Sequence, residues 1–401
     1  MMGSRQLTGQ VRLELGRVLS YWGSKTVDEV HGGFYGALDN HSRVIEGAPK
    51  GLVLNARLLW TFSRAYRHDG DEKWLRLAER ALNVLEEQFL DEQYGGYYWM
   101  LDSTGQPLHT KKQIYGQAFV LYALSEYMLA TGKRELLPRL QYIIDLVERS
   151  YDPIYNGYYE AYTREWQLEQ DLRLGSHDLN EKKSMNTHLH ILEAYTNAYR
   201  VWPADILRLR LRNLILLTVE RIVDPVTGHF RLFFDEDWTL KSERISCGHD
   251  IEGSWLLYEA AQVLGDPEIV ERIRPVVLAM ADVVLAEGID QDGGLWNEAG
   301  PEGIIDRDKD WWPQAEAAVG FINAWQLTGE SKYYAAAEAS WNFIENFMLD
   351  QEHGEWFWKV SESGTPYHEP KVNEWKCPYH NGRACFEILE RLEGEEYSEH
   401  I

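Results

Sequence analysis

Histidines recur where helices are predicted to begin. His190 lies in MNTHLH, His249 in SCGHDIEGS and His380 in KCPYHNGRAC, and each segment opens a run with apolar residues at helical spacing. One histidine at a helix end is usually a structural hydrogen-bonding residue, but three at the same relative position in three repeats predict one shared site. The positive end of a helix dipole favours neutral imidazole, which can act as a general base near pH 7. Two such bases on opposite faces of one carbon could remove a proton from one side and return it on the other.

Neighbouring residues indicate which histidine faces a common cavity. Asn186 and His190 are four residues apart and share a helix face, whereas His188 points to the opposite side, so we expect His190 in the cavity. His249 and Glu252 are three residues apart, so the carboxylate could fix the tautomer of the imidazole or bind a sugar hydroxyl. Both segments therefore predict polar groups on the inner face of a helix.

Tryptophans accompany the remaining polar segments. In DKDWWPQAEA, Pro313 suits a first helical position, Trp312 would lie at the cavity mouth, and Glu316 follows one turn later. Trp375 stands upstream of His380. Aromatic faces stack on sugar rings and also fill large cores, and a chain with 16 Trp and 23 Tyr can do both.

Paired helices are the elements that must position these groups. Short glycine–aromatic clusters recur at spacings of about 60 to 70 residues, at Gly33, Gly96, Gly157, Gly228, Gly294 and Gly354. Two helices are predicted between successive clusters, and a single helix opens and closes the chain, about twelve in all. This pattern predicts an all-α fold, an (α/α)6 barrel of six helical hairpins with short glycine–aromatic β-hairpin or loop insertions, as one domain over residues 1–401. The first helix of each pair, rich in small and aromatic residues, should form the inner ring. An open solenoid is the alternative, but the lone first and last helices can pair and close the barrel.

Composition limits the partners and the compartment. The net charge of −24 opposes binding to nucleic acid or to anionic membranes. Three cysteines, Cys247, Cys377 and Cys385, form no disulfide framework and indicate a reducing compartment. The N-terminus lacks the apolar segment of a signal peptide, and no apolar run reaches the ~18 residues of a membrane span. We therefore expect a cytoplasmic protein without nucleic-acid or membrane partners. Composition does not determine the oligomeric state, for which we expect a monomer or weak homodimer.

Other chemistries find less support in the residues. No HExxH motif is present, and His188 and His190, two apart on a helix, cannot chelate one ion well, so we expect no metal. There is no GxSxG motif and no phosphate-binding glycine loop. Inverting glycoside hydrolysis needs two facing carboxylates, for which Glu252 and Glu316 are candidates, but it leaves the three histidines unexplained.

Four histidine-bearing or tryptophan-bearing segments resemble the N-acylglucosamine 2-epimerase superfamily: MNTHLH (185–190), GHDIEGSWLL (248–257), WWPQAEA (311–317) and WKCPYHNGRAC (375–385). Within it, GGFYG (32–36) and APKGLVLNARLLWTFSRAY (48–66) are most similar to the cellobiose 2-epimerase branch. The resemblance covers nearly the whole chain and implies an (α/α)6 barrel without metal or nucleotide cofactor. It implies a small-molecule disaccharide substrate and reversible epimerisation at C2 of the reducing-end glucose in β-1,4-linked disaccharides, cellobiose to glucosyl-mannose and lactose to epilactose.

The resemblance also implies roles for individual residues. His249 and His380 would be the acid/base pair that deprotonates and reprotonates C2 of the ring-opened sugar through a cis-enediolate, and His190 would be the third active-site histidine. The expected substrate contacts are Arg57, Tyr115, Asp178, Asn186, Glu252, Trp312, Glu316 and Trp375. The alternatives are a monosaccharide enzyme on the same barrel (mannose 2-epimerase, mannose isomerase or N-acylglucosamine 2-epimerase) and, more distantly, a non-catalytic carbohydrate-binding barrel.

Overall fold

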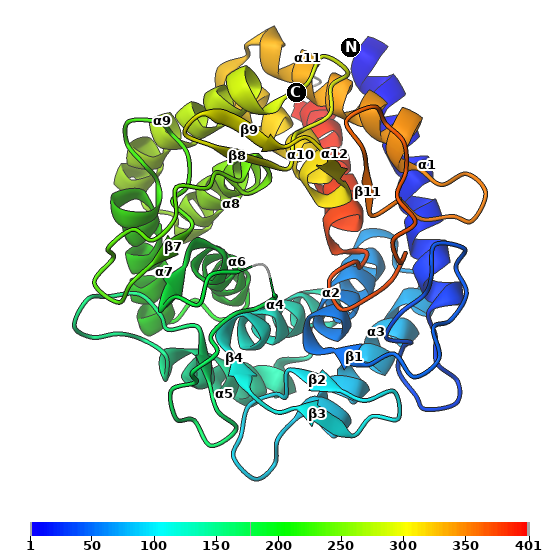
Figure 1. Cartoon of the computed structure of the whole chain (residues 1–401), viewed down its shortest axis with the longest axis vertical. Helices are drawn as coiled ribbons and strands as arrows, with labels where there is room; N and C mark the ends of the chain where they lie inside the picture. Colours follow the sequence, from blue (N-terminus) through cyan, green and yellow to red (C-terminus); the bar gives the residue numbers. More distant parts are fainter. Residues whose placement is uncertain (1, 177, 399–401) are drawn as a thin grey trace.

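Two concentric rings of helices make up the computed structural model, which describes residues 2–176 and 178–398 (Figure 1). Residues 1, 177 and 399–401 of the predicted domain lie outside the described residues. The inner ring consists of α2 (Leu52–Asp69), α4 (Ile114–Thr131), α6 (Met185–Val201), α8 (Cys247–Leu264), α10 (Trp311–Thr328) and α12 (Tyr379–Ser398). The outer ring consists of α1 (Met2–Lys25), α3 (Glu72–Val84), α5 (Leu137–Glu148), α7 (Asp205–Leu217), α9 (Pro267–Val283) and α11 (Ser331–Phe343). The predicted (α/α)6 barrel of about twelve helices is confirmed.

Burial separates the two rings as the sequence predicts. The first fifteen residues of α4, Ile114 to Met128, are all buried, because outer helices cover one side and the other inner helices the rest. In α3, only one face is buried, through Trp74, Ala78 and Ala81 with Val84. A helix that is apolar all round belongs inside a large protein, and one with a single apolar face belongs at its surface.

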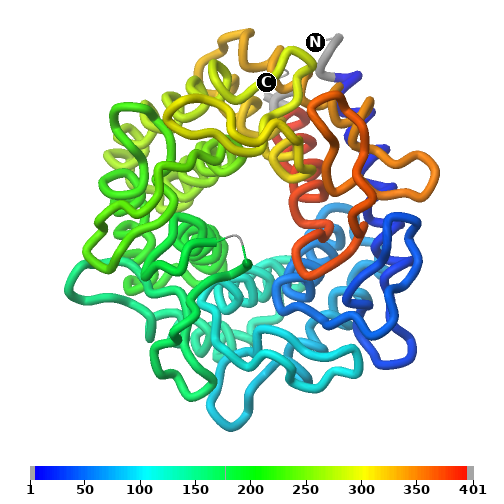
Figure 2. Tube along the Cα trace, viewed as in Figure 1, coloured from blue at the N-terminus to red at the C-terminus, as the bar shows by residue number. Residues whose placement is uncertain are grey.

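The barrel closes through the two ends of the chain. Each inner helix packs against the next, and α12 packs against both α10 and α2, which completes the ring. The first helix, α1, packs against α12 as its outer partner, and the colour sequence in Figure 2 shows the blue and red ends of the chain side by side. The open solenoid is therefore excluded.

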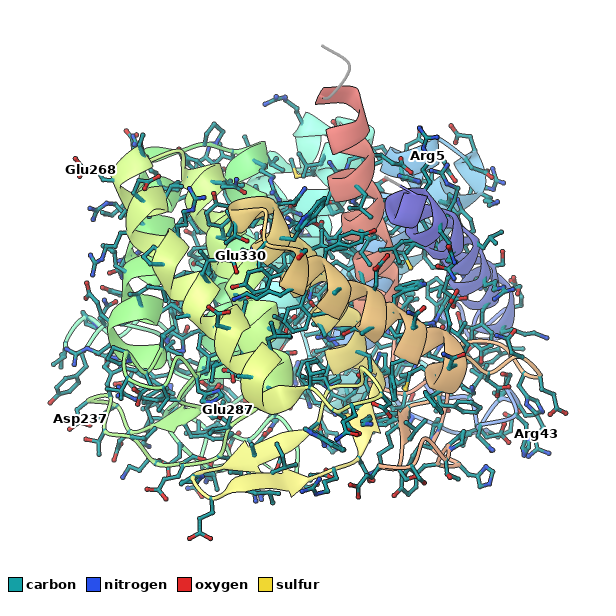
Figure 3. The ribbon with its side chains drawn as sticks, turned by 90° about the horizontal axis from the view of Figure 1, so that it is seen from above. Arg5, Arg43, Asp237, Glu268, Glu287 and Glu330 are labelled. Carbon is teal, nitrogen blue, oxygen red and sulfur yellow. The ribbon has the colours of Figure 1, made fainter. Side chains whose placement is uncertain are left out.

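Short antiparallel strands and turns connect the helices. One sheet contains β1 (Lys50–Gly51), β2 (Met100–Leu101) and β3 (Pro107–His109). The pairs are β4 (Lys112–Gln113) with β5 (Ala161–Tyr162), β6 (Lys183–Ser184) with β7 (Phe233–Phe234), β8 (Glu298–Gly300) with β9 (Gly303–Asp306), and β10 (Lys309–Asp310) with β11 (Lys359–Val360). In side view these strands gather at one end of the rings, near Arg43 and Asp237, whereas Arg5 and Glu268 mark the other end (Figure 3). The three-stranded sheet and the four strand pairs thus lie at the end of the barrel where the inner helices start.

Outer helices lead into the glycine–aromatic turns through a change of helix type. A 3₁₀ turn, Arg134–Leu136, precedes α5. Four outer helices, α3, α7, α9 and α11, end in π-helical turns: Leu85–Phe89, Thr218–Ile222, Val284–Gly288 and Ile344–Met348. After this wider last turn the chain continues into the turns at the end of the barrel where the strands lie.

A buried lysine stands two residues before four inner helices and bonds to an aspartate of the preceding turn. The pairs are Lys50–Asp28 (2.9 Å), Lys112–Asp91 (2.9 Å), Lys183–Asp152 (2.7 Å) and Lys309–Asp290 (2.7 Å). Lys376 holds the same place before α12, counted from Pro378, and pairs with Glu355 at 2.6 Å. These contacts keep the helix starts in register. Residues can therefore be compared by an aligned position, in which position 1 is Leu52, Ile114, Met185, Cys247, Trp311 and Pro378.

Candidate active site

A cavity of about 330 Å³ opens at the strand end of the barrel. It is lined by ten of the eleven predicted site residues: Arg57, Tyr115, Asp178, Asn186, His190, His249, Glu252, Trp312, Trp375 and His380. The eleventh, Glu316, does not line the cavity but lies directly behind His380. All six inner helices, together with the segments that carry Asp178 and Trp375, thus bring together residues more than 300 positions apart in the chain.

Aligned positions explain how the histidines meet. His249 on α8 and His380 on α12 both occupy position 3, and the ring of Trp312 on α10 lies between them, at centroid distances of 4.6 and 5.5 Å. His190 occupies position 6 of α6, which is one turn deeper. The expectation that all three share one relative position is therefore wrong: two share it, and the third lies below them.

Each cavity histidine is fixed through its Nδ1 atom. The Nδ1 atoms lie 2.7 Å from Ser246 Oγ for His249, 2.7 Å from Glu316 Oε1 for His380 and 2.9 Å from Glu193 Oε2 for His190. In the part of the chain that the structure describes, none of the three Nε2 atoms has a hydrogen-bond partner. A carboxylate at Nδ1 selects the tautomer with the proton there, which leaves Nε2 as the basic atom.

Burial keeps these imidazoles neutral. Loss of solvation lowers the pKa of His249 to about 3 and that of His380 well below its ordinary value, and it lowers the pKa of His190 despite the neighbouring Glu193. The positive charge of Arg57 lowers the pKa of His380 further. The sequence-based expectation of neutral histidines agrees with this geometry, but the main cause is burial rather than the helix dipole.

Below the histidines, three carboxylates surround one guanidinium. Arg383, at position 6 of α12, donates to Glu252 and Glu316 at 2.6 Å each and also to Glu193. Burial and the neighbouring Glu316 raise the pKa of Glu252 to about 8, whereas Arg383 holds the pKa of Glu193 at about 2 against the effect of burial. Of the two roles expected for Glu252, fixing the tautomer of His249 is therefore wrong, because Glu252 turns toward Arg383 and Ser246 orients His249 instead. Glu252 lines the cavity, and its contact with a sugar hydroxyl stays a prediction.

The carboxylate cluster disfavours two of the alternatives. Ligand atoms of Glu252, Glu316 and His380 lie within 4.8 Å of one another, the one group of this kind among the described residues. Inverting hydrolysis needs carboxyl groups about 6.5–9.5 Å apart on either side of a glycosidic bond, so this pair is too close. Arg383 also places a positive charge where a metal ion between the two carboxylates would lie.

Arg57, at position 6 of α2, is a buried cation with neutral neighbours. It donates to Tyr115 Oη at 3.0 Å and contacts Cys377 Sγ at 3.7 Å, and its guanidinium lies over the rings of Phe119 and Tyr379. Among the described residues no carboxylate forms an ion pair with it. Such a charge in a cavity wall is suited to binding an anion that forms there.

Several residues of the site were missed from the sequence. Arg383 and Glu193 each lie three residues after a cavity histidine, so the helix-face rule that selected His190 could have found both. Asp310, Trp311 and Trp358 also line the cavity. α10 begins at Trp311, which makes Pro313 its third residue rather than its first.

His188 has the structural role that its opposite direction predicts. Its Nε2 accepts from the backbone N–H of Tyr158 at 2.9 Å, and its Nδ1 bonds to the carbonyl of Ser184 at 2.7 Å. It occupies position 4, where Gln117 and Gln314 bond to the turns before their own helices in the same way. Position 4 therefore ties α4, α6 and α10 to their preceding turns.

Residues 33–384 match the N-acylglucosamine 2-epimerase family. The chain belongs to this family. It is 46% identical over 376 residues to the cellobiose 2-epimerase of Bacteroides fragilis, covering 93% of this chain and 96% of that protein. It is 38% identical over 377 residues to the cellobiose 2-epimerase of Dictyoglomus turgidum, covering 94% and 96%. The solved cellobiose 2-epimerase from Bacillus thermoamylovorans B4167 has a TM-score of 0.92 at 38% identity and covers 96% of this chain and 100% of that one.

Membership of the family makes the protein a carbohydrate epimerase, an enzyme of the isomerase class. The non-catalytic barrel is thereby excluded. Among the described residues, no helix is long and apolar enough to cross a membrane.

Proposed function

We propose that the protein reversibly epimerises C2 of the reducing-end glucose in β-1,4-linked disaccharides such as cellobiose and lactose. The observation that carries this proposal is the pair His249 and His380, which face one cavity from separate helices with their Nε2 atoms available. The names of the relatives, cellobiose 2-epimerases at up to 46% identity over nearly the full chain, support the disaccharide.

The two histidines suit removal of a proton from one face of C2 and its return to the other. Opening of the sugar ring exposes the C1 aldehyde, which acidifies the C2 proton. One neutral imidazole takes this proton at Nε2 and leaves a cis-enediolate. The second histidine takes up a proton at its Nε2 from a sugar hydroxyl or from water and delivers it to the opposite face of C2, and the first histidine then returns its proton to the sugar oxygen or to water. Because both side chains start neutral, either can act first, which suits a reversible reaction.

Arg57 suits stabilisation of the enediolate. Its charge is buried beside the cavity without a carboxylate partner, so the negative charge that develops on the sugar oxygens supplies the missing counter-charge. This interaction is stronger in the intermediate than with the neutral sugar, and such a difference lowers the barrier. His190, one turn deeper and oriented by Glu193, is placed to move protons at the sugar oxygens.

Aromatic rings support a substrate of two sugar units. Trp312 lies between the two histidines, and Trp375 and Trp358 also line the cavity. A ring of the disaccharide can stack on these faces while the reducing end reaches the histidines. Asn186 and Asp178 supply polar groups on the same wall.

The test is incubation in D2O with cellobiose, lactose, mannose and N-acetylglucosamine separately, with the products resolved by NMR. We expect C2 epimers of the two disaccharides, with deuterium at C2. Conversion of mannose or N-acetylglucosamine alone would overturn the disaccharide assignment.

Variants test the two bases in the same assay. His249→Asn and His380→Asn should each abolish epimer formation, whereas His188→Gln, a buried histidine outside the cavity, should retain it. Wild-type C2 exchange in both cavity variants would overturn the assignment of the histidines.

A further inference from the structure

The turn residue before each inner helix differs between hairpins. In four turns the residue before the buried apolar side chain is glycine: Gly33, Gly96, Gly157 and Gly294. A Cβ atom at any of them would lie 2.5–2.8 Å from a neighbouring side-chain atom. In the turns before α8 and α12 the equivalent residues are His229 and Glu355, both buried. These are the two hairpins whose inner helix carries a cavity histidine at position 3.

Glu355 keeps the backbone conformation of a glycine. Its φ is +64°, in the left-handed region where Gly33 (+66°) and Gly96 (+76°) also lie. A residue with a Cβ atom in this region carries about 1–2 kcal/mol of strain. Strain that persists in a buried turn points to a use for the side chain.

The Glu355 carboxylate joins three elements at the start of α12. It accepts from Lys376 Nζ at 2.6 Å, from Asn381 Nδ2 at 2.7 Å and from Trp22 Nε1 of α1 at 2.6 Å. Asn381 is the residue next to His380. The carboxylate therefore fixes the first turn of α12 directly beside the cavity histidine.

His229 makes the corresponding contact to α8. Its Nδ1 lies 2.7 Å from Oδ2 of Asp250, the residue next to His249, and the other oxygen of Asp250 accepts from the backbone N–H of Phe230 at 2.7 Å. Glu287 lies 3.5 Å from His229 Nε2 on the other side. The fourth hairpin has Ile245 where the other hairpins have the buried lysine, so His229 is the basic side chain that pairs with a carboxylate at this helix start.

We propose that His229 and Glu355 are positioning residues that hold His249 and His380 at the correct distance from C2. This inference rests on the proposed function, because it assumes that the two histidines transfer the C2 proton. Neither side chain lines the cavity, and each acts through the residue next to a histidine. Errors of about 1 Å in such a placement can reduce the rate of a reaction about 10²-fold.

Four variants test the proposal in the full-length protein: Glu355→Gly, Glu355→Gln, His229→Gln and, as the matched control, Lys50→Met. Glu355→Gly installs the residue of the other turns and removes the strain together with the carboxylate. We expect kcat to fall about 10- to 100-fold with KM changed less than about threefold, and Glu355→Gln to recover most of the loss because it still accepts hydrogen bonds. Lys50→Met breaks a buried ion pair at the start of α2, a helix that carries neither histidine, so it should lower the melting temperature but leave kcat within about twofold.

The partition of deuterium between substrate and epimer is a measurement that a loss of stability alone would not change. In D2O the enediolate either returns to labelled substrate or proceeds to labelled epimer. Weakening one histidine favours return, and weakening the other favours the epimer, so the His229 and Glu355 variants should shift the ratio of labelled substrate to labelled product in opposite directions. An unchanged ratio, or a shift in the same direction, would overturn the proposal. Absence of C2 deuterium in the wild type would instead overturn the proposed function itself.

Discussion

Two arginines at the same aligned position, on neighbouring inner helices, have opposite surroundings. Arg57 of α2 and Arg383 of α12 are both buried, and they lie over the ring of the same residue, Tyr379, at 4.5 and 4.2 Å. Arg383 is bonded to three carboxylates, whereas Arg57 has only neutral partners among the described residues. The paired cation holds the helices together, and the cation without a counter-ion is available to the substrate.

This difference shows how one buried layer can serve both stability and chemistry. When one partner of a buried ion pair is removed, the other charge stays buried without a counter-charge, which destabilises the fold. Arg57 already carries that cost in the free enzyme, and an anionic intermediate reduces it. The two residues should therefore respond to the same substitution in opposite ways.

The largest effect on the reaction is expected for Arg57→Met. Without the charge, the enediolate loses its main stabilisation, and kcat should fall about 10²- to 10³-fold. The melting temperature should stay the same or rise, because a buried unpaired charge is removed. Steady-state kinetics and thermal unfolding measure both. Arg64→Met, a buried arginine on the same helix that pairs with Glu390, is the control and should leave kcat unchanged. A large loss of stability in Arg57→Met would contradict the comparison.

The largest effect on stability is expected for Arg383→Met. It leaves Glu193, Glu252 and Glu316 together without a cation, so the free energy of unfolding should fall by about 3–5 kcal/mol. Denaturant titration at pH 7 measures the change. The loss should be smaller at acidic pH, where the carboxylates can protonate. An unfolding free energy equal to that of the wild type would mean that Arg383 is not the centre of this cluster.

A smaller effect is expected at His188, a buried imidazole whose hydrogen-bond partners among the described residues are backbone groups rather than a carboxylate. Burial lowers its pKa to about 4, below the ordinary value of 6.5. Between pH 6.5 and 4 the unfolded chain binds a proton that the folded chain excludes, so this histidine reduces stability as the pH falls, by about 1.4 kcal/mol per pH unit.

His188→Gln, the residue that α4 and α10 use at position 4, removes this effect and can keep the bond to the Tyr158 backbone. We expect near-equal stability at pH 7, with the variant more stable by about 2 kcal/mol at pH 5. Denaturant titrations at the two pH values measure it. The same difference between variant and wild type at both pH values would show that His188 is not held neutral.

The smallest effect is expected for Glu316→Gln. The substitution removes one of the three carboxylates around Arg383 and weakens the acceptor that orients His380, so kcat should fall about tenfold with little change in KM. Steady-state kinetics on cellobiose tests this, with Gln314→Glu in the same helix as a comparison for general disturbance of α10. A rise in KM alone would place Glu316 in substrate contact rather than behind the histidine.

Periodicity predicted most of the fold. The glycine–aromatic clusters located the turns, and the contrast between small, apolar helices and charged, amphipathic ones assigned the inner and outer rings. These are local signals, and tertiary packing did not override them. The choice of His190 over His188 also came from helical spacing alone.

Contacts between helices could not be predicted in this way. Glu252 lies one turn from His249 in sequence but bonds to Arg383, 131 residues away, because all inner helices point their position 6 residues at one another. The lysine that precedes five of the six inner helices was the signal that could have aligned them. With that register, His249 and His380 fall on one level and His190 on the next.

Closure of the barrel by the first and last helices has a consequence for folding order. α12 brings Arg383, His380 and Tyr379 together, so Glu193, Glu252 and Glu316 have no cation between them until the final helix docks. A chain that emerges from the ribosome one hairpin at a time must keep these three acids solvated or protonated until then. Docking of α12 therefore completes the ion-pair cluster, brings His380 to the cavity and closes the ring in one step. We expect a barrel without a docked α12 to be inactive.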